Sequence, residues 1–348
     1  MKLSVIIITC ILSFNYGECR PSTGPSIIAL PFNAGDDANA IISAMEKSSS
    51  DNKDKIVDIL MSKTISQRLE IGAAYENTKS DLVKDFKKDI GKYFDGGKDS
   101  DKNMLEILKT TPEFLASRIN RSVKKDGSDG YLSIIITSSS EMLRNVSIAY
   151  KKEYNQEMAM DISKHLGETD LAGFVFKLTS YNIDLQRSDH AKVDDELTKK
   201  LVNVMPNTKN DCSVEISKDF YEMMQKESFA QIKAVGELFQ QNSGSLAVDT
   251  IKKYCDGVLN TPFVLIMNFS MDPFKYFAHE MNEDIKGDND DEDSACPRIL
   301  ISRSEIDMAD IRTAYDAAYE NGLEWALRKY YKKREQMILT ALANGNQP

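Results

Sequence analysis

One helical segment occurs four times in the chain, and this repetition constrains the fold more than any other feature. The copies read SKTISQRLEIGAAY from Ser62, TSSSEMLRNVSIAY from Thr137, KESFAQIKAVGELF from Lys226 and SRSEIDMADIRTAY from Ser302. They align without a gap and lie roughly 80 residues apart, which is within the size of a small domain. The 348-residue chain is therefore predicted to contain four copies of one unit.

The third position of the segment always carries a hydroxyl group. Such a side chain can accept from backbone N–H groups that lack a partner in the first turn of a helix, for about 1 kcal/mol each. We therefore expect an N-cap in each copy, at Thr64, Ser139, Ser228 and Ser304. Three residues later, Gln67, Gln231 and Asp307 complete or approximate a capping box, whereas Met142 does not.

The tenth and fourteenth positions carry a β-branched residue and an aromatic residue. Residues four apart lie on one face of a helix, so this face is predicted to be buried. The residues are Ile71, Val146, Val235 and Ile311, followed by Tyr75, Tyr150, Phe239 and Tyr315.

The rest of each unit also shows helical spacing, and signals for strands are nearly absent. Residues 131–137 (YLSIIIT) and 261–269 (TPFVLIMNF) are the only candidates for strands. We interpret both as buried helix, because the sequence around them belongs to a repeated helical unit. The predicted fold class is all-α.

Composition limits the partners of such a chain. It is 41% hydrophobic and 28% charged, which is enough apolar material for a core, and its formal net charge is −10. We therefore expect no nucleic-acid partner. An anionic membrane would also repel the chain unless something bridges the two negative surfaces.

The first residues, MKLSVIIITCILSFNYGECR, have the layout of a secretory signal peptide. We predict a signal segment over residues 1–19 and a Pro-rich tail over 20–33, and hence a secreted or cell-surface protein; the alternative is a buried N-terminal helix. Cys212, Cys255 and Cys296 would remain after cleavage. A Cys212–Cys255 bridge, a Cys255–Cys296 bridge and buried free thiols all stay open.

Four helical units with the pattern SR-S/T followed by Ile and Ala-Tyr resemble the annexin family. SRSEIDMADIRTAY is similar to a fourth annexin repeat, and SQRLEIGAAYENTKSDLVKDFKKDIGKYFDG to the second half of a first one. The resemblance covers residues 34 to about 345. It implies four five-helix annexin-type repeats packed into a curved disc, over 34–97, 103–181, 193–270 and 273–345.

The resemblance also implies reversible, calcium-dependent binding to acidic phospholipids such as phosphatidylserine. In such a site a glycine-rich loop between the first two helices points carbonyl groups at Ca²⁺, and a carboxylate about forty residues later completes the protein ligands. A divalent ion would thus bridge an acidic protein and an acidic bilayer. Most annexins lack a signal peptide, so a cytoplasmic, peripheral membrane protein is the alternative location.

The first copy has the loop MEKSSSDNKD and keeps a distal acid. Its candidate calcium ligands are Met45, Ser48, Ser50 and Asp89. Serines 48–50 stand where glycines belong, and serine tolerates positive φ less well. The alternative is that these serines only cap the next helix.

The other copies depart further from the pattern. The fourth keeps Gly287 and offers Asn289 and Asp290, but Tyr330 replaces the distal acid. The second keeps Gly127 but has Lys164 and His165 near the distal position, and the third has no loop glycine and carries Tyr254 there. We therefore expect one or two calcium sites of low affinity at most.

The stretch RKYYKKR, residues 328–334, places cations where the fourth copy should complete its calcium site. We expect Lys332, Lys333 and Arg334 to contact lipid phosphates directly; the alternative is a solvated helix face.

No sequence motif of a hydrolase, phosphate-binding loop or zinc site occurs, so an enzyme is not predicted. Two functions remain: annexin-like membrane binding with weakened calcium dependence, or a helical scaffold that has lost it and binds a protein partner.

Overall fold

The computed structural model describes residues 24–47, 49–78, 85–94, 102–125, 130–180, 187–287 and 294–346. The expected signal segment over residues 1–19 lies outside them. The described residues form four successive groups of five α-helices. Group one contains α1 (Ala34–Met45), α2 (Ser50–Met61), α3 (Ile65–Asn77), α4 (Phe86–Phe94) and α5 (Lys102–Glu106). Group two contains α6 (Thr111–Lys124), α7 (Gly130–Thr137), α8 (Ser140–Tyr154), α9 (Met158–Leu166) and α10 (Asp170–Thr179).

The third group contains the only strand pairing in the described part of the chain. Its helices are α11 (Asp195–Leu201), α12 (Lys218–Lys226), α13 (Phe229–Ser243), α14 (Ala247–Tyr254) and α15 (Asn260–Met271), with a 3₁₀ turn η2 (Val202–Val204). The strands β1 (Asn210–Asp211) and β2 (Cys255–Asp256) pair in parallel. Group four contains α16 (Pro273–Lys286), α17 (Ala295–Arg303), α18 (Met308–Ala318), α19 (Gly322–Tyr330) and α20 (Lys333–Asn344). We refer to the groups as repeats 1 to 4.

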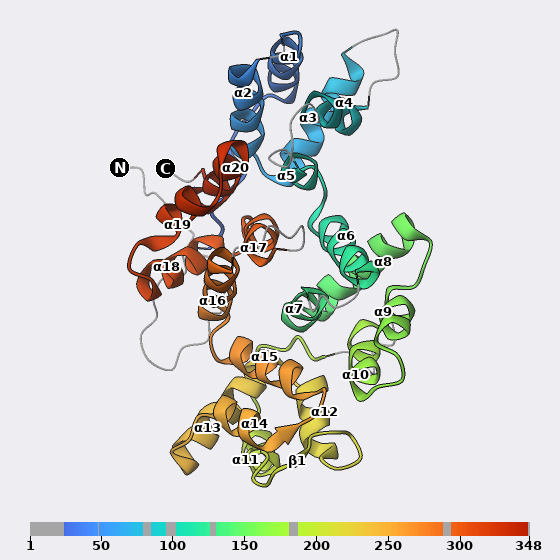
Figure 1. The fold of residues 1–348 in the computed structure, drawn as a ribbon, viewed down its shortest axis with the longest axis vertical. Helices are drawn as coiled ribbons and strands as arrows, with labels where there is room; N and C mark the ends of the chain where they lie inside the picture. Colours follow the sequence, from blue (N-terminus) through green and yellow to red (C-terminus); the bar gives the residue numbers. More distant parts are fainter. Residues whose placement is uncertain are drawn as a thin grey trace, which may run out of the picture.

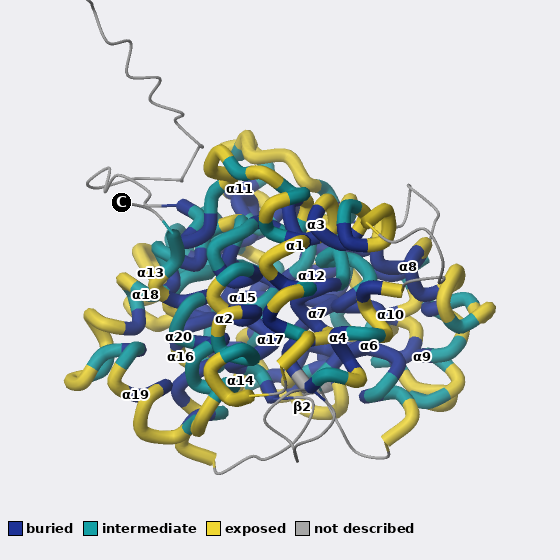
Figure 2. Tube along the Cα trace, turned by 90° about the horizontal axis from the view of Figure 1, so that it is seen from above, coloured by how far each residue is buried: buried dark blue, intermediate teal, exposed yellow. Residues whose placement is uncertain are grey.

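The repeats lie around a ring, so that repeat 4 packs against repeat 1 as well as repeat 3 (Figure 1). Seen edge-on, α11 lies toward one face of the disc, whereas α19 and β2 lie toward the other (Figure 2). The all-α disc predicted from the sequence is confirmed. No described helix is both long enough and apolar enough to span a bilayer.

The two segments that could have been strands are helices, as predicted. Residues 131–137 lie in α7, and every one of them is buried. Residues 261–269 lie in α15. A helix that is apolar on all sides can be stable only in the interior, and both helices lie near the middle of the ring (Figure 1).

Three of the four predicted N-caps are confirmed. Thr64, Ser139 and Ser228 each accept from the backbone N–H three residues later. Gln67 completes a full capping box. The side chain of Gln231 instead accepts from the Asp194 amide at 2.8 Å and so joins α13 to the start of α11.

The prediction for Ser304 is wrong. This residue has helical φ and ψ at the end of α17, and the next helix begins only at Met308. The reason is a local turn in which the Ile306 and Asp307 amides donate to the Arg303 carbonyl, while the Arg303 side chain pairs with Asp307. The Ser304 carbonyl accepts from the amides of Ser26 and Ile27, both at 2.9 Å.

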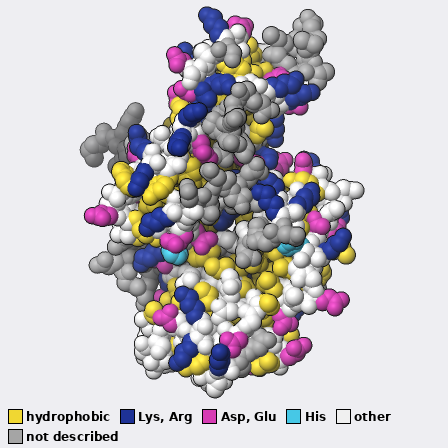
Figure 3. All heavy atoms as spheres, in the orientation of Figure 1, with side chains coloured by type: hydrophobic (Ala, Val, Ile, Leu, Met, Phe, Trp, Pro, Cys, Tyr) yellow, Lys and Arg dark blue, Asp and Glu magenta, His cyan; other side chains and the backbone are white. Residues whose placement is uncertain are grey.

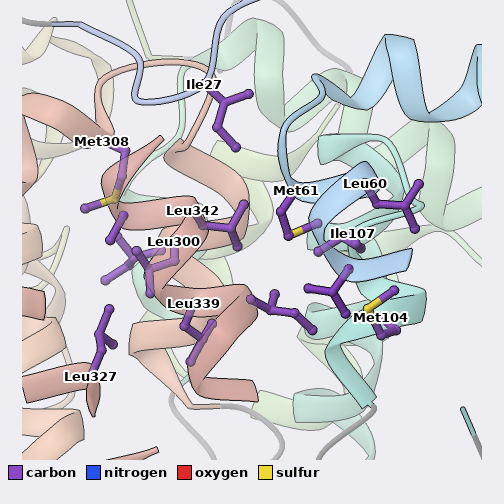
Figure 4. Packing of buried hydrophobic residues seen from close by; sticks show 14 of the residues in the cluster. Ile27, Leu60, Met61, Met104, Ile107, Leu300, Met308, Leu327, Leu339 and Leu342 are labelled. Atoms are coloured by element: carbon purple, nitrogen blue, oxygen red, sulfur yellow. The ribbon is translucent and has the colours of Figure 1, made fainter. Parts of the chain in front are cut away.

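The predicted apolar stripe forms the core. Ile71, Val146, Val235 and Ile311 are each 0% exposed, and the three tyrosines of the fourteenth position are buried, while Phe239 is half-buried. The buried residues form two clusters. One joins repeats 2 and 3, and the other joins repeats 1 and 4 across the closure of the ring. Figure 4 shows this closure, with Leu60 and Ile107 of repeat 1 facing Leu339 and Leu342 of repeat 4.

The segment before α1 fastens the closure. Ile27 is 1% exposed and points into the shared cluster (Figure 4). The Ser26 hydroxyl donates to the Leu342 carbonyl at 2.6 Å. The Asn346 side chain accepts from the Ile28 amide at 2.8 Å and donates to the carbonyls of Ile28 and Ser62 at 2.8 and 2.9 Å. The segment from α20 to Asn346 is thus hydrogen-bonded to residues 26–28, which precede α1.

Replacing Asn346 with alanine should therefore destabilise the protein. The substitution removes three part-buried hydrogen bonds and should lower the free energy of unfolding by about 2–3 kcal/mol, measured by urea denaturation. Asn344→Ala is the matched control, because Asn344 makes one exposed hydrogen bond, to Glu324. Equal stability of the two variants would show that the hydrogen bonds of Asn346 contribute nothing to the free energy of unfolding.

Candidate calcium and membrane site

In each repeat the predicted site combines the loop after the first helix with the fourth helix. In repeat 1, Met45 is the last residue of α1 and Ser50 is the first residue of α2. Ser49 caps α2 by accepting from the Asn52 amide at 3.2 Å. One serine of the loop therefore acts as an N-cap, as the alternative interpretation required. Ser48 lies outside the described residues.

The carbonyl groups of this loop already have donors. The Tyr93 hydroxyl lies 3.1 Å from the Ala44 carbonyl and 3.0 Å from the Lys47 carbonyl, and the Asn52 side-chain amide donates to Lys47 at 2.8 Å. A calcium ion that used the Lys47 carbonyl would have to compete with both donors. The fourth helix thus reaches the loop through a tyrosine side chain.

Asp89 lies in the middle of α4 and is half-buried. Its carboxylate accepts from the Tyr75 hydroxyl at 3.1 Å. Burial raises the pKa of Tyr75 to about 12, and the neighbouring Asp89 charge contributes in the same direction. The phenol therefore stays protonated and donates at neutral pH. Asp89 remains the one carboxylate that repeat 1 offers at the distal position.

The structure brings together two residues that the sequence analysis assigned to different sites. Arg334 donates to the Ser50 hydroxyl at 3.1 Å and to the Asp54 carboxylate at 2.9 Å. Lys53 also lies over the rings of Tyr93 and Phe94, at 5.6 and 5.5 Å. The Lys53 charge beside the loop of repeat 1 therefore opposes the binding of a further cation, whereas Asp54 offsets the charge of Arg334.

Repeat 3 joins the same two segments covalently. Cys212 of the loop after η2 is bonded to Cys255, the residue after α14, across 43 residues. Tyr254, which holds the distal position, directly precedes this cysteine. The bridge therefore connects the loop to the end of the fourth helix, the two parts that a calcium ion would bridge in an annexin-type site. Of the pairings left open by the sequence, the structure forms Cys212–Cys255, and Cys296 is a buried free thiol.

Repeats 2 and 4 have no carboxylate at the predicted distal position. In repeat 2 the rings of His165 and Tyr131 form a T-shaped pair, and the aspartate one turn earlier, Asp161, accepts from the Tyr150 hydroxyl. In repeat 4, Gly287 ends α16 with helical φ and ψ. The nearby Asp284 accepts from the Ala295 and Cys296 amides, both at 3.0 Å, and so caps α17.

The remaining predicted ligands lie outside the described residues, namely Asn289 and Asp290, as does Gly127. Within the described ranges, no three His, Cys, Asp or Glu side chains form a cluster suited to a metal. Of the sets tested, only repeat 1 combines a described loop with a distal carboxylate. A calcium ion that used the Lys47 carbonyl there would have to displace the Tyr93 hydroxyl from it.

The predicted lipid-binding cations differ in their surroundings. Lys332 and Lys333 are exposed, whereas Arg334 is half-buried by its contacts with α2. Lys333 has a φ of 53°, in the left-handed region, where it begins α20. Basic and acidic side chains are interspersed over the face in Figure 3, and no large area of one sign covers it.

Several residues at these loops escaped the sequence analysis. Tyr93, Asn52 and Asp54 were not singled out, because partners for loop carbonyls and for Arg334 come from other helices or another repeat. The sequence did contain a signal that favours pairing of Cys212 with Cys255. Their separation of 43 residues is close to the spacing of about forty that the resemblance implies between a loop and its distal ligand.

The comparisons with known proteins agree with this architecture. The family model described as Annexin matches residues 276–342. Annexin A3 of Mus musculus is 28% identical over 302 residues, which cover 85% of this chain and 89% of the relative. Annexin B10 of Drosophila melanogaster is 24% identical, over 86% of this chain and 90% of the relative.

Among solved structures, annexin III superimposes with a TM-score of 0.82 at 23% identity, covering 93% of this chain and 98% of that one. The ring of four five-helix repeats is therefore the annexin fold. Together with the family model and the relatives, which match over most of their length, it supports membership of the annexin family. Annexins in general bind acidic phospholipid membranes in a calcium-dependent way and are generally not enzymes.

Removing the disulfide should destabilise repeat 3. Closing a loop of this length contributes about 2–4 kcal/mol, mainly by restricting the unfolded chain. We expect Cys212→Ala/Cys255→Ala to lower the melting temperature measured by circular dichroism, and dithiothreitol to lower that of the unmodified protein similarly. Dithiothreitol should leave the variant unchanged, and an equal effect on both proteins would contradict the assignment of the bridge.

Proposed function

We propose that this protein binds acidic phospholipid surfaces as annexins do, but with weakened dependence on calcium. Membership of the annexin family supports the binding itself. The observation that carries the weakened dependence is the state of the loop in repeat 1, whose Lys47 carbonyl is occupied by Tyr93 and Asn52. Calcium binding there must replace existing hydrogen bonds, so its net gain is smaller.

The same reasoning limits the number of ions. Repeat 3 holds its junction with a disulfide, and repeats 2 and 4 lack a carboxylate at the predicted distal position. We infer one site at repeat 1, around Met45, Ser48, Ser50 and Asp89. A second is open at repeat 4, where Gly287, Asn289 and Asp290 would have to supply the ligands without a distal acid. Both would be of low affinity.

We further propose that exposed lysines supply attraction that calcium supplies elsewhere in the family. Lys332 and Lys333 follow α19, near the face that holds the loops. Each basic side chain close to an anionic membrane contributes about 1 kcal/mol. Arg334 contributes less, because Asp54 neutralises its charge.

We propose a secreted or cell-surface location. The signal-like segment at residues 1–19 supports it, and so does the Cys212–Cys255 bridge, because disulfides persist in oxidising compartments. Expression with residues 1–19 in a eukaryotic secretory host tests the proposal. Recovery from the medium of oxidised protein that begins after this segment is the expected result, and full-length reduced protein in the cytoplasm would overturn it.

The distal carboxylate of repeat 1 gives the first test of the binding function. We expect Asp89→Asn to raise the calcium concentration for half-maximal co-sedimentation with phosphatidylserine vesicles by roughly tenfold, equivalent to about 1.4 kcal/mol. Asp161→Asn is the matched control, because Asp161 also accepts from a tyrosine but does not hold the predicted distal position of its repeat. If both variants need the same calcium concentration for half-maximal co-sedimentation, Asp89 is not a calcium ligand. No sedimentation of the unmodified protein with calcium would favour a scaffold that binds a protein partner.

The exposed lysines give the second test. Lys332→Glu/Lys333→Glu should strongly reduce binding to phosphatidylserine vesicles in EGTA at low salt, where surface charge acts over the longest range. Lys199→Glu/Lys200→Glu on α11, toward the opposite face of the disc (Figure 2), should leave it unchanged. Arg334 is kept in both variants, since it holds repeat 1. Unchanged binding of the first variant would show that these lysines do not meet the membrane.

A further inference from the structure

A small cavity lies in repeat 4, at the end of α16 and beside the predicted fourth loop. Its volume is about 210 Å³, and its walls come from α16, α18, α19 and the turn before α19. The side chains that matter for its chemistry are Lys286, Tyr319, Glu320, Trp325 and Tyr330. The cavity is smaller than pockets for drug-sized ligands, so it suits a headgroup or another small polar molecule.

Aromatic rings form much of the wall, and cations already lie over them. Lys286 is 5.5 Å from the ring centre of Tyr319, and Lys329 is 4.7 Å from that of Trp325 and 4.9 Å from that of Tyr330. Trp325 is 45% exposed and Tyr330 is 43% exposed. Exposed aromatic faces attract quaternary ammonium groups, which bind them without needing hydrogen bonds.

The charges around the cavity have both signs and are not neutralised locally. Among the described residues, Lys286, Lys329 and Glu320 take part in no ion pair. A bare quaternary ammonium would be repelled by the two lysines, and a bare phosphate would be repelled by Glu320. A molecule that carries a quaternary ammonium and a phosphate a few bonds apart satisfies both sets of charges.

The position of the cavity indicates where such a molecule would come from. Lys286 directly precedes Gly287, and Tyr330 directly precedes Tyr331 and the exposed lysines. The cavity therefore opens beside the loops through which an annexin-like disc meets a bilayer. Tyrosine and tryptophan side chains are also favoured at the boundary between lipid and water.

We propose that this cavity binds the phosphocholine headgroup of a membrane lipid without calcium. The trimethylammonium group lies against Tyr319, Trp325 and Tyr330 with Glu320 beside it, and the phosphate lies by Lys286. Lys329 adds positive charge from over the rings of Trp325 and Tyr330. Phosphatidylserine fits less well, because its carboxylate would approach Glu320 and its ammonium group lacks the methyl groups that contact aromatic faces. The proposal concerns a headgroup other than that of the calcium loops, at a cavity that adjoins the predicted loop of repeat 4 and includes its distal position, Tyr330.

Trp325 is the only tryptophan of the chain and lines the cavity, so its fluorescence reports on binding directly. The full protein is titrated with phosphocholine in EGTA, with choline chloride and inorganic phosphate as separate titrants. We expect a saturable change with phosphocholine in the millimolar range or below, and weaker changes with choline or phosphate alone. No saturable change with phosphocholine would overturn the proposal.

Variants then assign the effect to the charges. Lys286→Gln and Glu320→Gln should each weaken phosphocholine binding by about fivefold or more. Lys253→Gln is the matched control, because Lys253 lies over Tyr254 at 4.7 Å in repeat 3, where no such cavity is assigned. Equal weakening by all three variants, or by none, would overturn the assignment. Melting curves must match those of the unmodified protein for the comparison to count, and Glu320 is exposed, so its variant should fold.

Vesicles distinguish a lipid from a soluble ester and separate this site from the calcium loops. Pure phosphatidylcholine vesicles in EGTA should shift Trp325 fluorescence in the unmodified protein, and Glu320→Gln should need about fivefold or more lipid for the same shift. Binding of free phosphocholine without any response to these vesicles would overturn the lipid assignment. Glu320→Gln should keep calcium-dependent sedimentation with phosphatidylserine vesicles, so failure of the proposed membrane function would show there independently.

Discussion

The packing of the first repeat against the fourth closes the ring, and the contacts of the segment before α1, of Asn346 and of Arg334 are built on it. A five-helix repeat cannot bury its apolar faces alone, so repeats 1 and 4 share one core cluster. Ile27 and Ser26 extend this contact to the segment before α1, and Asn346 fixes the end of the chain to it. Arg334 of repeat 4 extends the contact between repeats 1 and 4 to the surface, where it binds Asp54 and Ser50. A residue expected to meet lipid therefore holds two repeats together.

The loop-to-helix junctions show a second consistent feature. Each described junction is held by groups of the protein, in positions where a calcium-binding annexin-type site would need open oxygens. Repeat 1 uses the Tyr93 hydroxyl, repeat 3 uses the Cys212–Cys255 bridge, and repeat 4 surrounds its distal position with aromatic rings and lysines. In repeats 1 and 3 these contacts hold described residues of the junction without an ion, so an ion contributes less to their order. This is the physical basis for the proposal that binding to membranes depends more on side chains at the loops than on the metal.

The fold could be predicted from the sequence because its signals are local and repeated. Hydroxyl caps at Thr64, Ser139 and Ser228 and the stripe from Ile71 to Tyr75 follow from helix geometry alone. The cap at Ser304 failed because a contact distant in sequence intervened: the Ser304 carbonyl binds Ser26 and Ile27, and a turn fixed by Arg303 and Asp307 delays the next helix. The site was harder to predict for the same reason. The partners of Lys47, Ser50 and Arg334 are set by packing between helices and between repeats, which no spacing along the chain reveals.

The number of calcium ions bound at a membrane tests the central claim most directly. Isothermal titration of the protein with calcium, in the presence of excess phosphatidylserine vesicles, measures this stoichiometry and the affinity together. We predict one ion, or two at most, bound weakly, with residual attachment to the vesicles when calcium is removed. Four ions of similar affinity per chain would contradict the claim that the protein has replaced calcium at its junctions.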